Sequence, residues 1–282
     1  MTVQQRRDGL VAEQISLTYP GRETPVLAQL DARVAPGVFT VIVGPNACGK
    51  STLLRAFGRV LRPTTGRVAL DGTEIGGMNS KQFARAVALL PQSAVAPDGI
   101  TVGDLVARGR FPHQGMFRQW SKQDEQAVIW AMERTRTIEL ADRRVAELSG
   151  GQRQRVWIAM ALAQQTEILL LDEPTTYLDL AHQLEVLDLC RELVEEHGKT
   201  VVAVLHDLNQ AFRYADRLIA MRAGQILATG VPETIVTRDL VHDVFGIDCQ
   251  VVPDPLTGTP MVVPRSERPR VLQAAGDGTG PG

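Results

Sequence analysis

The strongest chemical signal in the sequence is a glycine-rich run that ends in lysine and serine. Gly44 to Ser51 reads G-P-N-A-C-G-K-S and matches the pattern G-x-x-x-x-G-K-[ST] of phosphate-binding loops. An apolar run, Phe39 to Val43, precedes it and a helical pattern follows it, as such a loop requires. Backbone N–H groups at a helix start attract phosphate, while Lys50 can reach the β- and γ-phosphate oxygens and Ser51 can offer a hydroxyl to Mg²⁺. We therefore predict a site for ATP and Mg²⁺.

A second signal supplies the acids that this chemistry needs. Asp172 and Glu173 follow four apolar residues, Ile168 to Leu171, which predict a buried strand. Asp172 then emerges at the carboxyl edge of the sheet, where open α/β sheets bind ligands, and can hold Mg²⁺. Glu173 is the candidate general base for water. Taken alone, an acid before Pro174 would be a solvated group at a turn, but beside Asp172 and a phosphate-binding loop we favour the catalytic interpretation.

A third motif, Leu148-Ser-Gly-Gly-Gln152, begins a helix that is expected to run to about Ala163. Ser149 is placed to cap this helix, whose first turn is then a second site suited to an anion. One nucleotide has one γ-phosphate. Two separate phosphate cradles in one chain therefore raise the possibility that the loop of one copy faces the motif of another copy.

These motifs require strands that alternate with helices. Ile168–Leu171 and Thr200–Leu205 are apolar runs on either side of an amphipathic helix, Leu180–His197, which predicts a right-handed crossover in a buried parallel sheet. Few strand-like runs and several helix starts from about Ser93 to Ala163 indicate a helical insertion. Further strands are expected at Leu10–Tyr19, Val38–Val43 and Arg67–Leu70, a helix at Lys50–Val60, and a hairpin at Arg217–Met221 and Gln225–Ala228.

The expected organisation is a core with one insertion. We predict that residues 8–92 and 164–264 form an ATP-binding α/β core with an antiparallel β region and a small C-terminal segment. Residues 93–163 form the helical part. Residues 265–282 form a disordered tail, because their last part is rich in glycine and lacks large apolar groups.

The composition excludes several classes of protein. With 30 Lys and Arg against 32 Asp and Glu, the net charge of −2 provides no global positive field for a nucleic-acid backbone. Three scattered cysteines do not make a disulfide framework, and no run approaches the roughly 18 apolar residues of a transmembrane helix. We expect a cytoplasmic protein, so that a membrane process would need another chain to cross the bilayer.

From Leu10 to about Pro264 the sequence resembles the ABC ATPase family, most specifically in the L-S-G-G-Q motif before Asp172. The resemblance implies an α/β fold, the P-loop NTPase ABC cassette, with a mainly parallel sheet core, an antiparallel β subdomain and an inserted helical subdomain. It also implies two ATP molecules held between two head-to-tail copies. The expected nucleotide-binding residues are then Gly44, Pro45, Asn46, Ala47, Cys48, Gly49, Lys50, Ser51 and Thr52 of one copy, and Ser149, Gly150, Gly151 and Gln152 of the other.

Four further positions match the family one by one. Tyr19 matches the aromatic residue that stacks on adenine, although a tyrosine at a strand end is otherwise a core residue. Gln92 matches the glutamine that senses Mg²⁺ and water, which places it among both the catalytic and the metal-binding residues. His206 matches the histidine that binds the γ-phosphate, although a histidine at a strand end is otherwise a satisfied polar group. Asp179 matches the aspartate that helps to join the two copies.

The phosphate-binding loop departs from the family pattern at one position. Ala47 stands where members usually have glycine. A β-carbon at positive φ would cost about 1–2 kcal/mol, so we expect a helical or bridging φ at Ala47. Cys48 is expected to be a packing residue, although its place beside Lys50 allows the hypothesis that alkylation of the thiol blocks ATP binding.

Two strings, residues 148–164 and 172–183, look like the ATPases of bacterial importers for ferric siderophores, haem and cobalamin, and most like the siderophore group. This resemblance implies a second copy of the chain, transmembrane permease subunits and, indirectly, a substrate-binding protein as partners, with no nucleic acid. It places the chain at the cytoplasmic face of the cell membrane. Arg108–His113 resembles that group's segment near the permease, but a solvated basic turn would look the same.

Three alternatives stay open: an importer ATPase for haem or cobalamin, an ABC ATPase that acts on nucleic acid or ribosomes, and a regulatory nucleotide-binding module without turnover. ABC proteins of the second class carry long coiled coils or two cassettes in tandem, and neither appears in 282 residues with one P-loop. The third class conflicts with the presence of Glu173 and His206.

Overall fold

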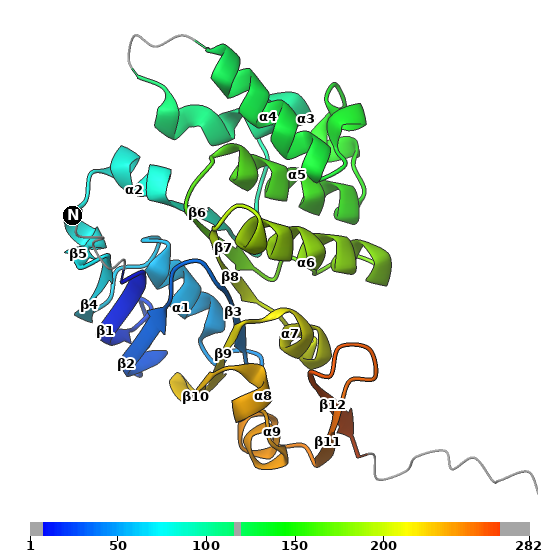
Figure 1. The fold of residues 1–282 in the computed structure, drawn as a ribbon. Coiled ribbons are helices and arrows are strands. Elements are labelled where there is room, and N and C mark those ends of the chain that lie inside the picture. Colours follow the sequence, from blue (N-terminus) through cyan, green and yellow to red (C-terminus); the bar gives the residue numbers. More distant parts are fainter. Residues whose placement is uncertain (1–7, 116–119, 266–282) are drawn as a thin grey trace, which may run out of the picture.

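The computed structural model describes residues 8–115 and 120–265 of the chain. At its centre lies a six-stranded sheet in the order β10-β9-β3-β8-β7-β6 (Figure 1). Neighbouring strands from β9 to β6 are parallel, and β10 pairs antiparallel with β9. The strands are β3 (Phe39–Val43), β6 (Val87–Leu90), β7 (Ile168–Asp172), β8 (Thr200–Val204), β9 (Arg217–Arg222) and β10 (Gln225–Gly230).

The middle strands form because both of their faces are covered. Every residue of β3, β7 and β8 is buried. Successive side chains of β3 enter two different cores, since Val41 and Val43 belong to one cluster and Ile42 to the other. A sheet of this kind exposes only the ends of its strands, so polar chemistry is confined to the loops at its two edges.

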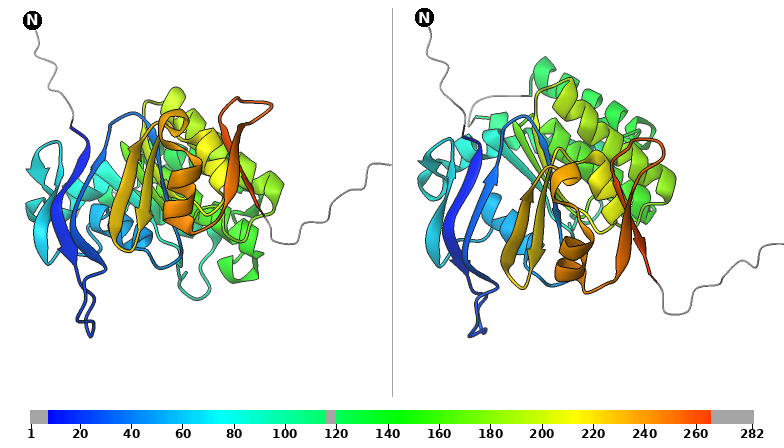
Figure 2. Two further views of the ribbon diagram at one scale, coloured as in Figure 1. Left: turned by 90° about the horizontal axis from the view of Figure 1, so that it is seen from below. Right: turned by 60° about the horizontal axis from the view of Figure 1, so that its bottom comes forward.

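A four-stranded antiparallel sheet lies beside the central sheet, in the order β2-β1-β4-β5 (Figure 2, blue to cyan). Helix α1 (Lys50–Phe57) joins the two, because its Leu53 and Phe57 share one apolar core with Ile15 of β1 and Val202 of β8. The strands of the antiparallel sheet are β1 (Leu10–Leu17), β2 (Leu27–Val34), β4 (Thr65–Leu70) and β5 (Thr73–Glu74).

Three helices lie between β6 and β7 in the chain and form one end of the molecule (Figure 1, green). They are α3 (Val102–Ala107), α4 (Lys122–Arg134) and α5 (Gly150–Ala163), with short 3₁₀ turns at Arg108–His113, Ile138–Leu140 and Val145–Glu147. The first residues of α4 and α5 are held by complete capping boxes, Ser121 with Asp124 and Ser149 with Gln152. The expected cap of α5 at Ser149 is therefore confirmed.

The C-terminal end of α5 is fastened to its surroundings. Arg110 Nη1 donates to Ala163 O at 2.6 Å, and Gln164 Nε2 donates to Val87 O of β6 at 3.2 Å. The N-terminal end of the same helix, at Ser149 and Gly150, is exposed. Helix α5 is thus bonded to its surroundings at its C-terminal end, while its first residues reach the surface.

The rest of the chain completes the layers around the sheet and ends in a hairpin. The elements are α2 (Ser80–Ala86), α6 (Leu180–Glu195), α7 (Leu208–Tyr214), α8 (Pro232–Ile235), α9 (Arg238–Phe245), β11 (Cys249–Pro253) and β12 (Pro260–Pro264). The hairpin of β11 and β12 packs on α7, where the Asn209 side chain exchanges two hydrogen bonds with the backbone of Val262 at 2.8 and 3.3 Å.

The expected fold class is confirmed, with small differences at the ends of elements. β1 ends at Leu17 instead of Tyr19, and α1 ends at Phe57 instead of Val60, since Arg59 has a left-handed φ of 57°. The strand β2 and helices α2 and α7 were not expected. The domain boundaries stay predictions, and the expected tail lies outside the described residues except for Arg265, whose N–H donates to Asp248 O.

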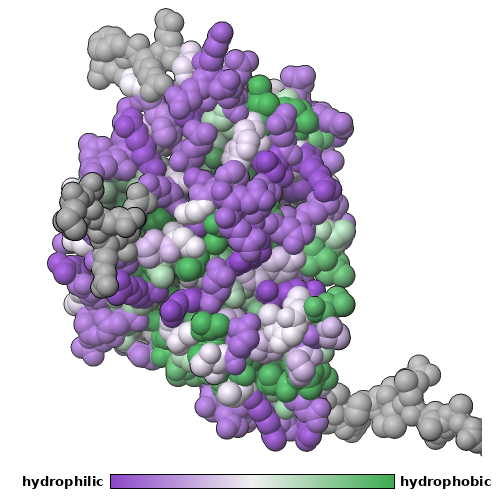
Figure 3. Space-filling model, viewed as in Figure 1, coloured by the Kyte–Doolittle hydropathy of each residue, from purple (hydrophilic) through white to green (hydrophobic). Residues whose placement is uncertain are grey.

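The surface is chemically mixed. Figure 3 shows mostly hydrophilic residues over the upper part of one face and more apolar residues over its lower part. Leu227, Val231 and Ile247, in and around the C-terminal elements, are among the exposed large apolar side chains. In the part of the chain that the structure describes, no helix is both long and apolar enough to cross a bilayer.

The segment Arg108–His113 differs from the expected basic turn. Arg108 is exposed, but Arg110 is only 2% exposed and its Nε donates to Asp124 Oδ1 at 2.9 Å. Burial alone would raise the pKa of Asp124, but hydrogen bonds from Ser121 and Arg110 outweigh it and lower that pKa to about 2. Arg110 therefore belongs to a buried ion pair inside the helical part, and the alternative of a solvated basic turn was wrong for Arg110. That the segment lies near a permease stays a prediction.

We predict that Asp124→Ala lowers the free energy of unfolding by about 3–5 kcal/mol, because the buried Arg110 guanidinium loses its counter-ion. Urea unfolding followed by circular dichroism measures the change. Glu125→Ala, at the exposed neighbouring position of α4, is the matched control. Equal losses in the two variants would contradict the buried pair.

Candidate functional site

The phosphate-binding loop connects β3 to α1 in a shape that two glycines permit. Gly44 and Gly49 have φ values of 155° and 106°. A β-carbon on Gly44 would lie 2.2 Å from Met221 O, and one on Gly49 would lie 2.8 Å from Leu27 Cδ2. Larger residues cannot occupy these positions without moving β9 or β2. The loop therefore wraps tightly around the N-terminus of α1, where backbone N–H groups are free to bind an anion.

Lys50 is the first residue of α1 and is only 5% exposed. Its ammonium group donates to Gly44 O and Pro45 O, both at 2.9 Å. The charge is thus held inside the curve of the loop by two backbone carbonyls instead of by a carboxylate. It remains available to a phosphate oxygen in the same concavity.

The expectation for Ala47 was wrong. Its φ is 61°, in the left-handed region, and not helical or bridging. The packing of Gly44 and Gly49 sets the course of the loop, so Ala47 takes the conformation that the family's usual glycine would take, at a cost of about 1–2 kcal/mol. Cys48 is 5% exposed and packs into the apolar core, which agrees with its expected packing role. Burial raises the pKa of its thiol despite the nearby Lys50, which disfavours the thiolate that alkylation needs.

Asp172, at the end of β7, is fully buried beside α1. Ser51 Oγ donates to its Oδ1 at 2.7 Å, and Arg55 Nη2 lies 3.7 Å from its Oδ2. Burial raises the pKa of Asp172, and the contacts with Ser51 and Arg55 only partly oppose this. Oδ2 has no hydrogen-bond partner among the described residues. A buried carboxylate oxygen without such a partner, next to a serine hydroxyl, is a donor set that fits Mg²⁺.

Arg55, which lines the same pocket as Ser51, was not expected from the sequence. It stands four residues after Ser51 and therefore one turn further along the same face of α1. That spacing from a residue expected to contact Asp172 was the signal that could have identified it. Arg22 and Val26, which also line the pocket described below, had no comparable signal.

Glu173 and His206 form a pair at the same edge of the sheet. β7 and β8 are parallel, with Asp172 opposite Val204, so the residues that follow the two strands meet. His206 Nε2 lies 2.8 Å from Glu173 Oε1, and Thr176 Oγ1 donates to Glu173 Oε2 at 3.2 Å. The carboxylate side chain is 11% exposed and the imidazole 44% exposed. Glu173 also has a φ of 56°, a strained conformation that turns the chain directly after the strand.

These residues surround one pocket of about 610 Å³. Tyr19 lies on its wall, with its hydroxyl 3.2 Å from Thr52 Oγ1, and Gln92 follows β6 at its rim. The lining residues that were expected from the sequence are Tyr19, Asn46, Ala47, Gly49, Lys50, Ser51, Thr52, Gln92, Glu173 and His206. The chain thus brings most of the expected site residues together.

The L-S-G-G-Q residues lie elsewhere. Ser149 caps α5 by accepting from Gln152 N at 3.2 Å, while Gln152 Oε1 accepts from Ser149 N at 3.1 Å. Asp179 caps α6 and is exposed. None of the residues 149–152 and 179 is among the described residues that line the pocket of Lys50. The described part of the chain therefore presents the helix starts of the two motifs at separate places.

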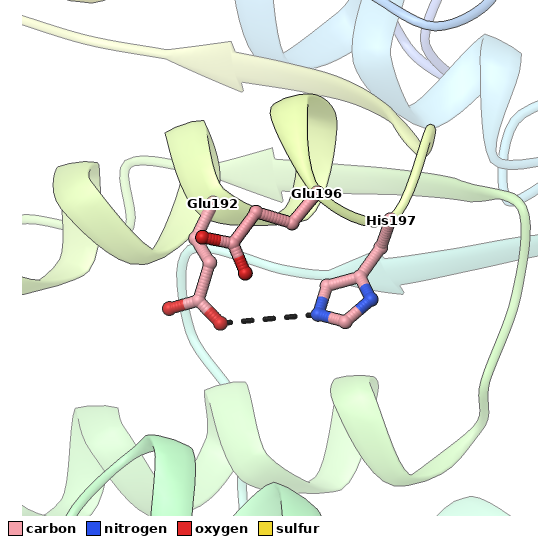
Figure 4. Close-up of side chains that lie close together, drawn as sticks. All are labelled: Glu192, Glu196 and His197. Atoms are coloured by element: carbon pink, nitrogen blue, oxygen red, sulfur yellow. Dashed lines mark ion pairs between the residues drawn. The ribbon is translucent and has the colours of Figure 1, made fainter.

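A second group of ionisable side chains lies at the C-terminal end of α6, where Figure 4 shows Glu192, Glu196 and His197 close together. Glu192 is paired with Arg134 of α4, its Oε1 lying 2.6 Å from Nη1. The His197 ring packs edge-on against Trp130 of α4, with 5.9 Å between ring centroids. The partners of this group come from α4, so we assign it to packing between α4 and α6.

The family and its relatives agree with this geometry. A family model described as ABC transporter matches residues 27–176. The chain is 54% identical over 255 residues to the ferric enterobactin transport ATP-binding protein FepC of Escherichia coli (strain K12), covering 90% of this chain and 93% of that protein. It is 51% identical over 262 residues to the petrobactin import ATP-binding protein FpuD of Bacillus anthracis, covering 93% and 95%.

Two solved structures share the fold. One is an inward-facing conformation of a putative metal-chelate type ABC transporter, with a TM-score of 0.77 and 28% identity over 93% of this chain and 98% of that chain. The other is a dimeric post-hydrolysis state of the ATP-binding cassette MJ0796 bound to ADP and Pi, with a TM-score of 0.71 and 28% identity over 79% and 98%. On the family model and these relatives, the chain belongs to the ABC transporter family.

Proposed function

We propose that this chain is the ATP-hydrolysing subunit of an importer for ferric siderophores. The observation that carries the proposal is the single pocket in which Lys50, Ser51 and the Glu173–His206 pair meet above Asp172. Relatives that are about half identical over nearly the whole chain are named as ATP-binding proteins of ferric enterobactin transport, petrobactin import and a siderophore transport system, which supports this class of cargo.

In this proposal Lys50 binds the β- and γ-phosphate oxygens, and Tyr19 packs against the adenine. Ser51 and Asp172, with Gln92, hold Mg²⁺, which neutralises negative charge on the phosphates. Two observations support these roles: Ser51 donates a hydrogen bond to Asp172, and Tyr19 and Gln92 line the pocket.

Hydrolysis needs one proton transfer. Glu173 accepts a proton from water as the water oxygen bonds to the γ-phosphorus and the bond to the β,γ-bridging oxygen breaks, which leaves ADP and phosphate. His206 Nε2, which lies 2.8 Å from Glu173 Oε1, turns its one N–H to the γ-phosphate, which orients the phosphate and leaves the carboxylate free for the water. The carboxylate can take this role because it is only 11% exposed and therefore poorly hydrated.

Two copies complete the site. The start of α5 in one copy faces the γ-phosphate bound by the other, so that Ser149 and Gly151 close the pocket and Asp179 lies at the joint. Closure of the pair moves transmembrane permease subunits that receive cargo from a substrate-binding protein. The chain then works at the cytoplasmic face of the membrane as a peripheral subunit.

We predict that Glu173→Gln lowers the ATP hydrolysis rate by about 10²–10⁴-fold, because the amide cannot accept the proton from water. ATP binding, measured by calorimetry, should persist, since the phosphate contacts of Lys50 do not involve Glu173. Glu196→Gln, an exposed change directly after the end of α6, serves as control. Turnover at the wild-type rate in Glu173→Gln would refute the base assignment.

Asp172→Asn is expected to change the pH dependence of stability. The folded-state pKa of Asp172 is raised, so its contribution to folding is present below the ordinary aspartate pKa and is lost as pH rises through the raised value. The free energy of unfolding of the wild type, relative to Asp172→Asn, should therefore fall as pH rises above the ordinary aspartate pKa of 3.8. Urea unfolding of both proteins without nucleotide tests this, and a difference that stays constant with pH would count against it.

The cargo is tested in cells. Deleting the gene should abolish uptake of radioactive iron supplied as a ferric siderophore while leaving cobalamin uptake intact. Restoring the wild-type chain should restore uptake, and a Lys50→Ala chain should not, because it lacks the charge that binds phosphate. Loss of cobalamin uptake with normal iron uptake would assign the chain to the alternative importer class.

A further inference from the structure

The loop that follows Glu173 is a tight turn with unusual backbone conformations. Thr176 N donates to Glu173 O at 3.2 Å, and Leu178 N donates to Thr175 O at 3.3 Å. Glu173 and Tyr177 both have left-handed φ values, 56° and 66°. Non-glycine residues persist in this conformation only where neighbouring groups hold them. The question is which groups hold this loop.

Gln183 of α6 holds the far end of the loop. Its Nε2 donates to Leu178 O at 3.0 Å. Because the amide nitrogen faces this carbonyl, Oε1 of the same side chain is left as an acceptor. Gln210 of α7 uses it: Gln210 Nε2 donates to Gln183 Oε1 at 2.8 Å, and Gln210 is only 8% exposed. Two glutamines from different helices thus form one directional chain of hydrogen bonds.

The other end of this chain reaches His206. Gln210 N donates to Asp207 Oδ1 at 2.9 Å, and Asp207 caps α7 immediately after His206. His206 in turn lies 2.8 Å from Glu173, where the loop begins. The contacts therefore close a ring. It runs from Glu173 along the loop to Leu178, through Gln183 and Gln210 to Asp207 and His206, and back to Glu173.

The same loop also touches α5, the helix of the L-S-G-G-Q motif. Gln154 Nε2 donates to Pro174 O at 3.1 Å. A β-carbon on Gly151 would lie 3.2 Å from Leu178 Cδ2, so the start of α5 packs closely on the loop. Tyr177, at the tip, is 81% exposed and free to meet a second copy. The loop thus stands between the Glu173–His206 pair and the motif that serves the other nucleotide.

We propose that Gln183 and Gln210 are positioning residues that tie the loop 174–179 to His206. When two copies close and displace this loop, the hydrogen bonds of the two glutamines set the distance and orientation between Glu173 and His206. The effect of this ring on catalysis rests on the proposed function. The mechanical link, which is the set of hydrogen bonds that join the loop to His206, does not depend on that function because it lies within one chain. Neither glutamine lines the nucleotide pocket, so both act through other residues.

Amide hydrogen exchange on the nucleotide-free protein tests the link. Gln183→Leu should speed exchange of the Gln210 amide about fivefold, and Gln210→Leu should speed exchange of the Thr176 and Leu178 amides by a similar factor. If the loop and α7 are coupled through the two glutamines, a substitution on either side must change the exchange of amides on the other side. Gln123→Leu, at an exposed position of α4, is the matched control. Effects confined to the helix that carries each substitution would overturn the ring.

Steady-state kinetics tests the positioning role. Gln210→Leu and Gln183→Leu should lower kcat about tenfold with KM for ATP within about twofold, since the base is displaced and the phosphate loop is not. Gln183→Glu keeps the acceptor for Gln210 but loses the donor to Leu178, so its kcat should be intermediate. If a leucine variant fails to fold, the kcat of Gln183→Glu tests the positioning role in its place.

The two failures are distinguishable. A wild-type protein that does not hydrolyse ATP overturns the proposed function and with it the kinetic role, while the exchange result still decides the mechanical link. A wild type that hydrolyses ATP, with Gln210→Leu and Gln183→Leu at wild-type kcat, overturns the positioning role alone. A raised KM with unchanged kcat would also overturn it, because that pattern reports a distorted phosphate loop.

Discussion

The site depends on the parallel pairing of four neighbouring strands. β3, β8, β7 and β6 run side by side in one direction, so their carboxyl ends meet at one edge of the sheet. The chain leaves each strand at a different functional position: Gly44 after β3, His206 after β8, Asp172 at the end of β7 and Gln92 after β6. A slip of one residue in this register would turn Asp172 to the other face and separate Glu173 from His206. The chemistry is therefore a consequence of backbone pairing far more than of any single side chain.

Several charged side chains are buried or partly buried at this edge of the sheet, and each of them has a partner within the protein. Asp172 is held by Ser51 and Arg55, Lys50 by two backbone carbonyls, and Glu173 by His206 and Thr176. These partners are weak or neutral compared with a phosphate or a divalent cation. The raised pKa of the buried Asp172 shows that the balance still disfavours its charge. The buried charge of Asp172 therefore lowers the folding stability, and a ligand of opposite charge that binds at this place can raise it again.

The motifs could be predicted from the sequence because each is short, contiguous and next to an apolar run. The parallel sheet followed from the same runs. Tertiary features could not be predicted this way. The φ of Ala47 is set by the packing of Gly44 and Gly49 against β9 and β2, and the burial of Arg110 depends on Asp124 from another helix. The strand β2 was missed because Gln29, with a φ of 46°, interrupts the alternation of buried and exposed residues that marks a strand.

The way α5 is held at its two ends makes it a lever. Its C-terminus is bonded to Arg110 and, through Gln164, to β6, while at its N-terminus Ser149 and Gly150 are exposed and Gly151 packs on Leu178 of the neighbouring loop. Fourteen helical residues span about 21 Å at 1.5 Å per residue. A pivot of about 10° at the fixed end would then carry Ser149 through an arc of about 4 Å, longer than a hydrogen bond. Small rotations of the helical part that contains α5 are therefore enough to displace Ser149 by more than a hydrogen-bond length, with the sheet itself at rest.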